Sequence, residues 1–204
     1  MKLESESAAR ELAKKDMIKN FGDIAFTPSV KAFQKALGSR KTYARLEGTE
    51  HRNKLTAEEV EFISERDSFY LSTVGENGWP YMQYRGGAKG FLRVIDERTL
   101  GFADFKGNAQ YISLGNVTDT GRACLFLMDY PNRFRLKIWA DAKISNDPEL
   151  ISQLSMPGYP MAAVRAFVFQ IHAFDWNCQQ HIVQRYTPEE YELAFPPNAS
   201  KGDP

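Results

Sequence analysis

Apolar and polar side chains alternate strictly between Phe134 and Ile144, and this is the clearest pattern in the chain. One face of the segment carries Phe134, Leu136, Ile138, Ala140, Ala142 and Ile144. The opposite face carries Arg135, Lys137, Trp139, Asp141 and Lys143. A period of two is typical of a β-strand that rests one face on a core. The pattern therefore predicts a long strand with its mostly charged face turned away from the core.

Five other segments have the composition and length of strands. They are 69–74, 79–85, 99–103, 123–130 and 162–174. The first two are joined by the short sequence GENG, which predicts a β-hairpin. The segment 123–130 is apolar on both faces, which favours a central position in a sheet. We therefore expect six strands.

Capping signals predict helices on both sides of the strands. The predicted helices are 7–22, 27–41, 55–67, 146–154 and 187–195. The first ends at Gly22, and the second has Thr27 as its cap and Gly38 at its end. The third opens with a capping box made by Thr56 and Glu59.

The order of these elements predicts a mainly β fold with peripheral helices. The strands follow one another without a sustained alternation of strand and helix, which argues against a doubly wound α/β fold. Short antiparallel strands in this number favour a barrel over an open sheet. We expect an N-terminal helical extension at 1–54, a barrel domain at 55–184, and a C-terminal helix and tail at 185–204.

Composition narrows the classes of function. The 204 residues include 26 basic and 26 acidic side chains, so the formal net charge is zero and gives no general reason to expect a nucleic-acid partner. No apolar run approaches the roughly 20 residues that span a bilayer, and the first residues lack the apolar segment of a secretory signal. We therefore expect a cytoplasmic protein without a membrane partner, whose two cysteines stay reduced.

The segment DFKGNAQYISLGN carries the first candidate site, because a strand is expected to end there and a helix to follow. Asn108 is a good N-cap for that helix, and Gly115 would end it. The free backbone N–H groups of a first helical turn bind anions, so a phosphate could dock there, flanked by Lys106 and Gln110. The alternative is an ordinary capped helix that only joins two strands.

Two further features allow both a functional and a structural interpretation. Gly86 and Gly87 follow directly after a predicted strand, where they either let a flat ligand approach the backbone or form a bulge at a barrel corner. Arg133, Arg135 and Lys137 share one face of the next-to-last strand. They either bind a phosphate or an electron-rich ring, or form a solvated edge.

A metal centre is not expected. Cys178 and His181 have CxxH spacing, but the sequence offers no second pair of ligands for a zinc ion. A nucleophilic Cys–His pair is not favoured either, since no partner that would orient the histidine is visible. No catalytic residue is assigned.

Taken in order, five segments resemble those of the pyridoxamine 5′-phosphate oxidase-like proteins, which are FMN-binding split β-barrels. The segments are TAEEVEFISERD, FYLSTVGENGWPYMQYRGG, LGFADFKGNAQYISLGN, RACLFLMDY and RFRLKIWADAKI. The resemblance extends from about Leu55 to His181 and is closest to an uncharacterised branch of that family. No single segment is decisive, but the ordered set with its matching gaps is specific.

The resemblance implies a homodimer with one FMN in each of two grooves at the subunit interface. The flavin ring and ribityl chain would lie along Gln83, Tyr84, Arg85 and Gly86. The ribityl chain and phosphate would be held by Ala103, Asp104, Phe105, Asn108 and Gln110. Further contacts to the ring or its open face would come from Arg135, Trp176 and His181.

The sequence departs from the family pattern at two points. The Arg-Lys pair that usually binds the phosphate is replaced by Ala109 and Gln110, so Lys106 or Arg85 would have to supply the charge. The usual C-terminal arginine–leucine–histidine cluster for the substrate phosphate is replaced by NCQQHIVQRY. Oxidation of pyridoxamine phosphate itself is therefore not expected.

The expected function is that of an FMN-dependent oxidoreductase that acts on a small organic molecule, with the flavin supplying the redox chemistry. One alternative is a flavin-binding or stress-response module without turnover. Another is a split barrel that binds a different flat cofactor, such as a deazaflavin or haem.

Overall fold

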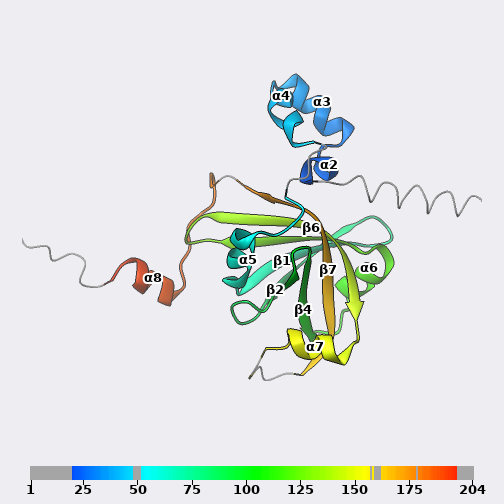
Figure 1. The fold of residues 1–204 in the computed structure, drawn as a ribbon, viewed down its shortest axis with the longest axis vertical. Coiled ribbons are helices and arrows are strands. Elements are labelled where there is room, and N and C mark those ends of the chain that lie inside the picture. Colours follow the sequence, from blue (N-terminus) through cyan, green and yellow to red (C-terminus); the bar gives the residue numbers. More distant parts are fainter. Residues whose placement is uncertain (1–19, 48–51, 157, 159–161, 178, 197–204) are drawn as a thin grey trace, which may run out of the picture.

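The computed structural model describes residues 20–47, 52–156, 158, 162–177 and 179–196 of the chain. Within these residues the chain forms one antiparallel sheet with short helices around it (Figure 1). The strands are β1 (Ser68–Val74), β2 (Pro80–Gly86), β3 (Arg93–Asp96), β4 (Thr99–Phe105), β5 (Arg122–Asp129), β6 (Phe134–Ser145) and β7 (Ala163–Trp176). The predicted fold class, mainly β with peripheral helices, is confirmed.

The described sheet has seven strands rather than the six predicted, in the order β2-β1-β5-β6-β7-β4-β3. The additional strand is β3, which pairs with β4 in a short hairpin. Its four residues are mostly exposed, so their sequence has no hydrophobic face long enough to indicate a strand. The edges of the sheet are β2 and β3, and β5 lies between β1 and β6 as its apolar sequence predicts.

The core lies on one face of the sheet. Leu136 and Ile138 of β6 are fully buried, which confirms the alternation read from the sequence. Phe102 of β4 and Phe167 of β7 stack with ring centroids 5.1 Å apart. The opposite face of β5 is only half-buried, so the expectation that both its faces are covered is not met within the described chain.

Three helices lie beside the strands within the described residues. They are α5 (Ala57–Ser64), α6 (Ile112–Thr120) and α7 (Pro148–Leu154). A fourth, α8 (Pro188–Ala194), stands away from the sheet (Figure 1). The predicted capping box at the start of α5 is present between Thr56 and Glu59. Leu154 of α7 packs against Ala103 and Ala166, so this helix covers the end of β4 and the start of β7.

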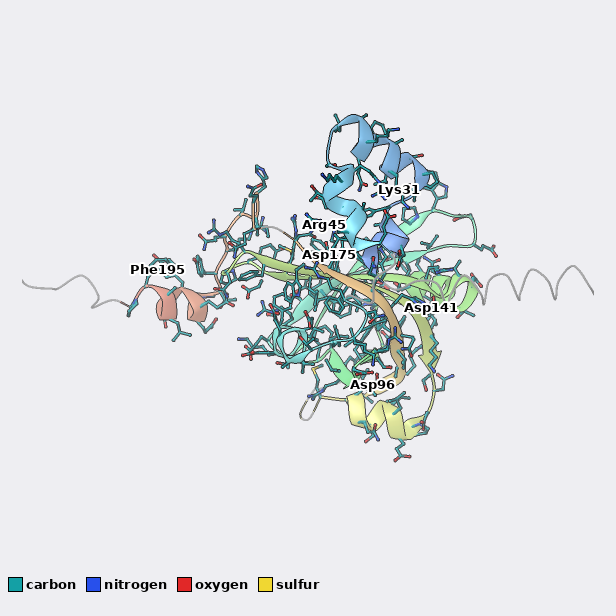
Figure 2. The ribbon with its side chains drawn as sticks, turned by 45° about the horizontal axis from the view of Figure 1, so that its top comes forward. Lys31, Arg45, Asp96, Asp141, Asp175 and Phe195 are labelled. Atoms are coloured by element: carbon teal, nitrogen blue, oxygen red, sulfur yellow. The ribbon has the colours of Figure 1, made fainter. Side chains whose placement is uncertain are left out.

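The N-terminal helices stand outside the barrel, next to β6 (Figure 1). They are α2 (Phe21–Ala25), α3 (Pro28–Ala36), α4 (Arg40–Tyr43) and the 3₁₀ turn η1 (Ala44–Leu46). Figure 2 shows Lys31 and Arg45 in this group, far from Phe195 at the end of α8. Phe21 connects the group to the sheet by stacking on Trp139, with centroids 6.2 Å apart.

Two N-terminal predictions have different outcomes. Thr27 caps α3 through Val30 N, and Gly38 after its end has a φ of +82°, as predicted. The helix predicted at 7–22 lies mostly outside the described residues. The predicted end of this helix at Gly22 is wrong. Asn20 accepts a hydrogen bond from Gly22 N and caps the start of α2, so a helix begins where the predicted one should end.

Candidate functional site

A polar groove lies where β2, the end of β4, the start of β7 and α6 come together. Its cavity volume is about 360 Å³. The side chains and backbone that line it are those of Tyr81, Gln83, Arg85, residues 104–114, Val164, Arg165 and Phe167. Strand β2 contributes Tyr81, Gln83 and Arg85, which are alternate residues and therefore lie on one face of the strand.

The pleat of β2 decides which of its side chains face the groove. Gln83 and Arg85 lie opposite Leu71 and Phe69 of β1, whose side chains point into the core. Successive side chains of a strand point to opposite faces, so Tyr84 points away from the groove. Its ring lies against that of Tyr70, with centroids 5.7 Å apart.

The junction after β4 does not have the predicted geometry. Asn108 accepts a hydrogen bond from Gln110 N at 3.2 Å, but it forms a local turn and does not cap a helix. Ala109 and Tyr111 both have left-handed backbones, with φ of 59° and 54°. These two residues delay the helix, because a left-handed residue cannot continue a right-handed turn.

Helix α6 therefore begins at Ile112 and ends before Gly121, which has a φ of 62°. Gly115, predicted as its end, lies in its interior. The first turn of α6 still borders the groove, because Ile112, Ser113 and Leu114 line it. Free N–H groups of that turn favour an anion at this position.

Two arginines and one aspartate form a charged cluster in the groove. Asp104 Oδ1 lies 3.7 Å from Arg85 Nη1, and Asp104 Oδ2 lies 3.5 Å from Arg165 Nε. Asp104 of β4 is paired directly with Arg165 of β7 across the sheet. Burial raises the pKa of the Asp104 carboxyl, and the two guanidinium groups only partly offset that effect.

Aromatic rings hold both guanidinium groups in place. Arg85 lies 5.5 Å from the ring centre of Phe167 and 5.7 Å from that of Phe102. Arg165 lies 5.8 Å from the ring centre of Tyr111. Contacts of this kind favour a cation over the ring face, so the two side chains are oriented before any ligand arrives.

The cluster has unused hydrogen-bond donors. The Nε atoms of Arg85 and Arg165 are buried, and neither has a hydrogen-bond acceptor in the described part of the chain. Buried donors without a partner cost free energy. An anionic ligand in the groove would supply acceptors, so the residues present fit a phosphate group.

The structure brings seven of the thirteen predicted site residues together in the groove. They are Gln83, Arg85, Asp104, Phe105, Lys106, Asn108 and Gln110. The other six do not line it. They are Tyr84, Gly86, Ala103, Arg135, Trp176 and His181.

Three of these six lie far from the groove. Trp176 is at the end of β7, eleven positions after Arg165, which is roughly 36 Å along a straight strand. Its Nε1 donates to Glu59 Oε1 at 2.7 Å, so its polar atom has a structural partner. Arg135, at the start of β6, precedes Leu136, which is paired with Trp176. His181 lies in a turn after β7 and has a φ of 64°.

The predicted positions of Arg133 and of the Cys178–His181 pair have different outcomes. Arg133 does not share the strand face of Arg135, because it lies in the turn before β6 with a φ of 58°. Cys178, the other member of the CxxH pair, lies outside the described residues. Among the described residues, no cluster of three or more metal-binding side chains occurs.

Ten of the residues that line the groove were not selected from the sequence, and four of them have polar side chains: Tyr81, Tyr111, Ser113 and Arg165. Tyr81 could have been found, because it shares a strand face with Gln83. Arg165 had a weaker signal, a single cation in an otherwise apolar strand. Tyr111 and Ser113 had none, because their role depends on where α6 begins.

Comparisons with known proteins match most of the barrel. The model of the family described as Pyridoxamine 5′-phosphate oxidase matches residues 55–174. Among proteins with curated functions, none matches the chain. No helix within the described ranges is long and apolar enough to cross a membrane.

Several solved structures have a similar fold. HupZ from Group A Streptococcus has a TM-score of 0.51 at 14% identity, over 65% of this chain and 99% of that one. A putative pyridoxamine 5′-phosphate oxidase from Lactobacillus delbrueckii has a TM-score of 0.47 at 22% identity, over 60% and 94%. An FMN-binding protein from Syntrophomonas wolfei has a TM-score of 0.46 at 16% identity, over 71% and 97%.

Proposed function

Because the chain belongs to the pyridoxamine 5′-phosphate oxidase family, we propose that it binds FMN and acts as an oxidoreductase on a small organic molecule. The observation that carries the proposal is the groove, with its buried arginine Nε donors beside the first turn of α6. A bound flavin supplies the redox chemistry, and the chain supplies binding, orientation and charge.

The phosphate end of FMN is assigned to the cationic part of the groove. Arg85 and Lys106 line it together with the first turn of α6. Guanidinium and ammonium groups form strong charge-assisted hydrogen bonds with phosphate oxygens. The sequence has no dinucleotide fingerprint for a second phosphate and adenosine, which favours FMN over FAD.

Gln83 is the residue best placed to orient the remainder of the ligand. Its Oε1 accepts a hydrogen bond from Ser113 Oγ at 3.1 Å, which fixes the direction of the amide. The Nε2 amide group of Gln83 can only donate hydrogen bonds. A donor at this place suits the carbonyl and hydroxyl oxygens of a flavin.

We further propose that the protein is a homodimer in which each groove is completed by the partner. The predicted ligand contacts Arg135, Trp176 and His181 lie at the opposite end of the barrel from the groove. They would reach a flavin only in the groove of a second copy. The half-buried outer face of β5 supports such an interface, because a partner would cover it.

Identification of the bound cofactor tests the proposal. The purified protein should absorb light as a flavoprotein, and mass spectrometry of the molecule released by heat should identify FMN. Release of FAD, a deazaflavin or haem alone would contradict the proposal.

Turnover is tested separately. Bleaching of the flavin absorption by NAD(P)H, followed by its return when an organic acceptor is added, is the result expected of an oxidoreductase. A flavin that no donor reduces would leave FMN binding intact and identify a binding module without turnover.

A further inference from the structure

Arg165 has a buried Nε donor in the groove but is not one of the two cations, Arg85 and Lys106, assigned to the phosphate end of FMN. It lies at the start of β7 and is paired across the sheet with Asp104. Its side chain lines the groove, where the guanidinium lies 5.8 Å from the ring centre of Tyr111, the residue that precedes α6. It therefore reaches the same place as the first turn of the helix, although it comes from a different strand.

The charges in the groove match a phosphate monoester only when Arg165 is included. Arg85, Arg165 and Lys106 each carry one positive charge, and Asp104 carries at most one negative charge. The groove therefore has an excess of at least two positive charges among its lining residues. A phosphate monoester carries about −1.5 to −2 charges at neutral pH, so the two would nearly cancel.

We propose that Arg165 binds the phosphate group of the ligand together with Arg85, and that these two arginines replace the Arg-Lys pair whose positions hold Ala109 and Gln110. This inference rests on the proposed function. In this scheme the positive charge that binds the phosphate comes from strands β2 and β7 and not from the junction after β4. An arginine is suited to this role because its planar group presents several donors to one phosphate.

Asp104 is a positioning residue in this scheme. Its two carboxylate oxygens contact Arg85 and Arg165 separately, so it holds the two guanidinium groups on the same side of the groove. These are ion-pair distances of 3.7 and 3.5 Å and not hydrogen bonds, so the Nε donors of both arginines remain available to a phosphate. The carboxylate also offsets the repulsion between the two cations when no ligand is present.

Comparing FMN with riboflavin isolates the phosphate contact, since the two ligands differ only in that group. The full-length protein, stripped of flavin, is titrated with each ligand by fluorescence quenching. Arg165→Ala should weaken FMN binding about tenfold to a hundredfold, the effect of losing a charge-assisted hydrogen bond. Riboflavin affinity should change less than about twofold, since riboflavin has no phosphate to lose.

Two other variants make the result specific. Arg93→Ala removes an exposed arginine of β3 outside the groove, and should leave both affinities unchanged. Arg165→Lys keeps the charge but loses the planar group, so its FMN affinity should lie between those of the wild type and Arg165→Ala. The thermal midpoint of each variant is measured alongside.

The outcomes separate this inference from the proposed function. Equal FMN affinity in Arg165→Ala and Arg93→Ala would overturn the role of Arg165 while FMN binding stands. Equal losses of FMN and riboflavin would show that Arg165 acts through the fold, and would overturn it as well. A wild-type protein that binds neither flavin would overturn the proposed function itself.

Discussion

Glu59 shows how one residue can have both a local and a tertiary role. It lies on α5 and is only 4% exposed. Its Oε2 accepts from Thr56 N and Thr56 Oγ1 at 2.9 and 2.6 Å, which closes the capping box. Its Oε1 accepts from Trp176 Nε1 at the end of β7. A single carboxylate therefore connects the start of α5 to the far end of the barrel.

These contacts predict how stability depends on pH. Burial raises the pKa of Glu59, but the hydrogen bonds from Thr56 and Trp176 outweigh burial and lower it below its ordinary 4.5. A carboxyl with a lowered pKa in the folded state stabilises the protein above its unfolded pKa. That stabilisation is lost as the pH falls through the folded-state pKa, which lies below 4.5.

Glu59→Gln should therefore lower the free energy of unfolding by roughly 1–3 kcal/mol at pH 7. The difference from the wild type should shrink as the pH falls below 4.5 and through the folded-state pKa, because the wild-type carboxyl then becomes neutral as well. Urea unfolding of the two proteins, followed by tryptophan fluorescence at pH 7 and at a pH below 4.5, measures this difference. A difference that is the same at both pH values would contradict a role for the charge.

At the scale of the element, α6 shows the limit of capping signals. Asn108 and Gly115 have the residue types that begin and end helices, yet neither does so here. Asn108 uses its side chain in a local turn, and two left-handed residues follow it. The end of the helix is Gly121, whose N–H bonds Val117 O and whose left-handed backbone favours glycine.

Alanine at the two glycines should have opposite effects. Gly121→Ala forces a side chain into the left-handed region and should cost about 1–2 kcal/mol of stability. Gly115→Ala should stabilise the protein by about 0.5–1 kcal/mol, because a Cβ there meets no atom within 4 Å and alanine favours a helix interior. Denaturant midpoints compare the two. If Gly115→Ala lowered the stability as much as Gly121→Ala, the helix would have to end at Gly115.

At the scale of the whole molecule, the groove and two of the predicted ligand contacts, Arg135 and His181, lie in different places. The groove holds the cations and the first turn of α6 on one side of the barrel. Arg135 and His181 lie at the other end of β7, with the half-buried face of β5 near them in the sheet order. One copy places the two sets at opposite ends of the sheet, and the proposed homodimer would bring both sets to a single ligand.

Light scattering at micromolar concentration should therefore give about twice the 23.2 kDa mass of one chain. The mass should not change when FMN is removed if the interface is mainly apolar. A monomer that binds FMN as tightly as the dimer does would contradict the shared groove.

The sequence by itself determined the backbone elements whose patterns are local. The alternation at 134–144, the hairpin around GENG and the capping box at Thr56 all appear in the structure. Each depends on neighbouring residues, whose periodicity decides which face of a strand or helix is buried. The family could be identified for the same reason, since it rests on the order and spacing of such segments.

Only the tertiary structure decided which side chains meet. Arg85, Asp104 and Arg165 come from three strands. Strand β4 pairs with β7, and β2 reaches the end of β4 through side chains although the two strands are far apart in the sheet order. The sequence pattern gives the faces of each strand but not the strand order or the register between them. Arg135 and Trp176 are separated from the groove by distance along the strands, because Trp176 lies at the far end of β7 from Arg165 and is paired with Leu136, the residue after Arg135.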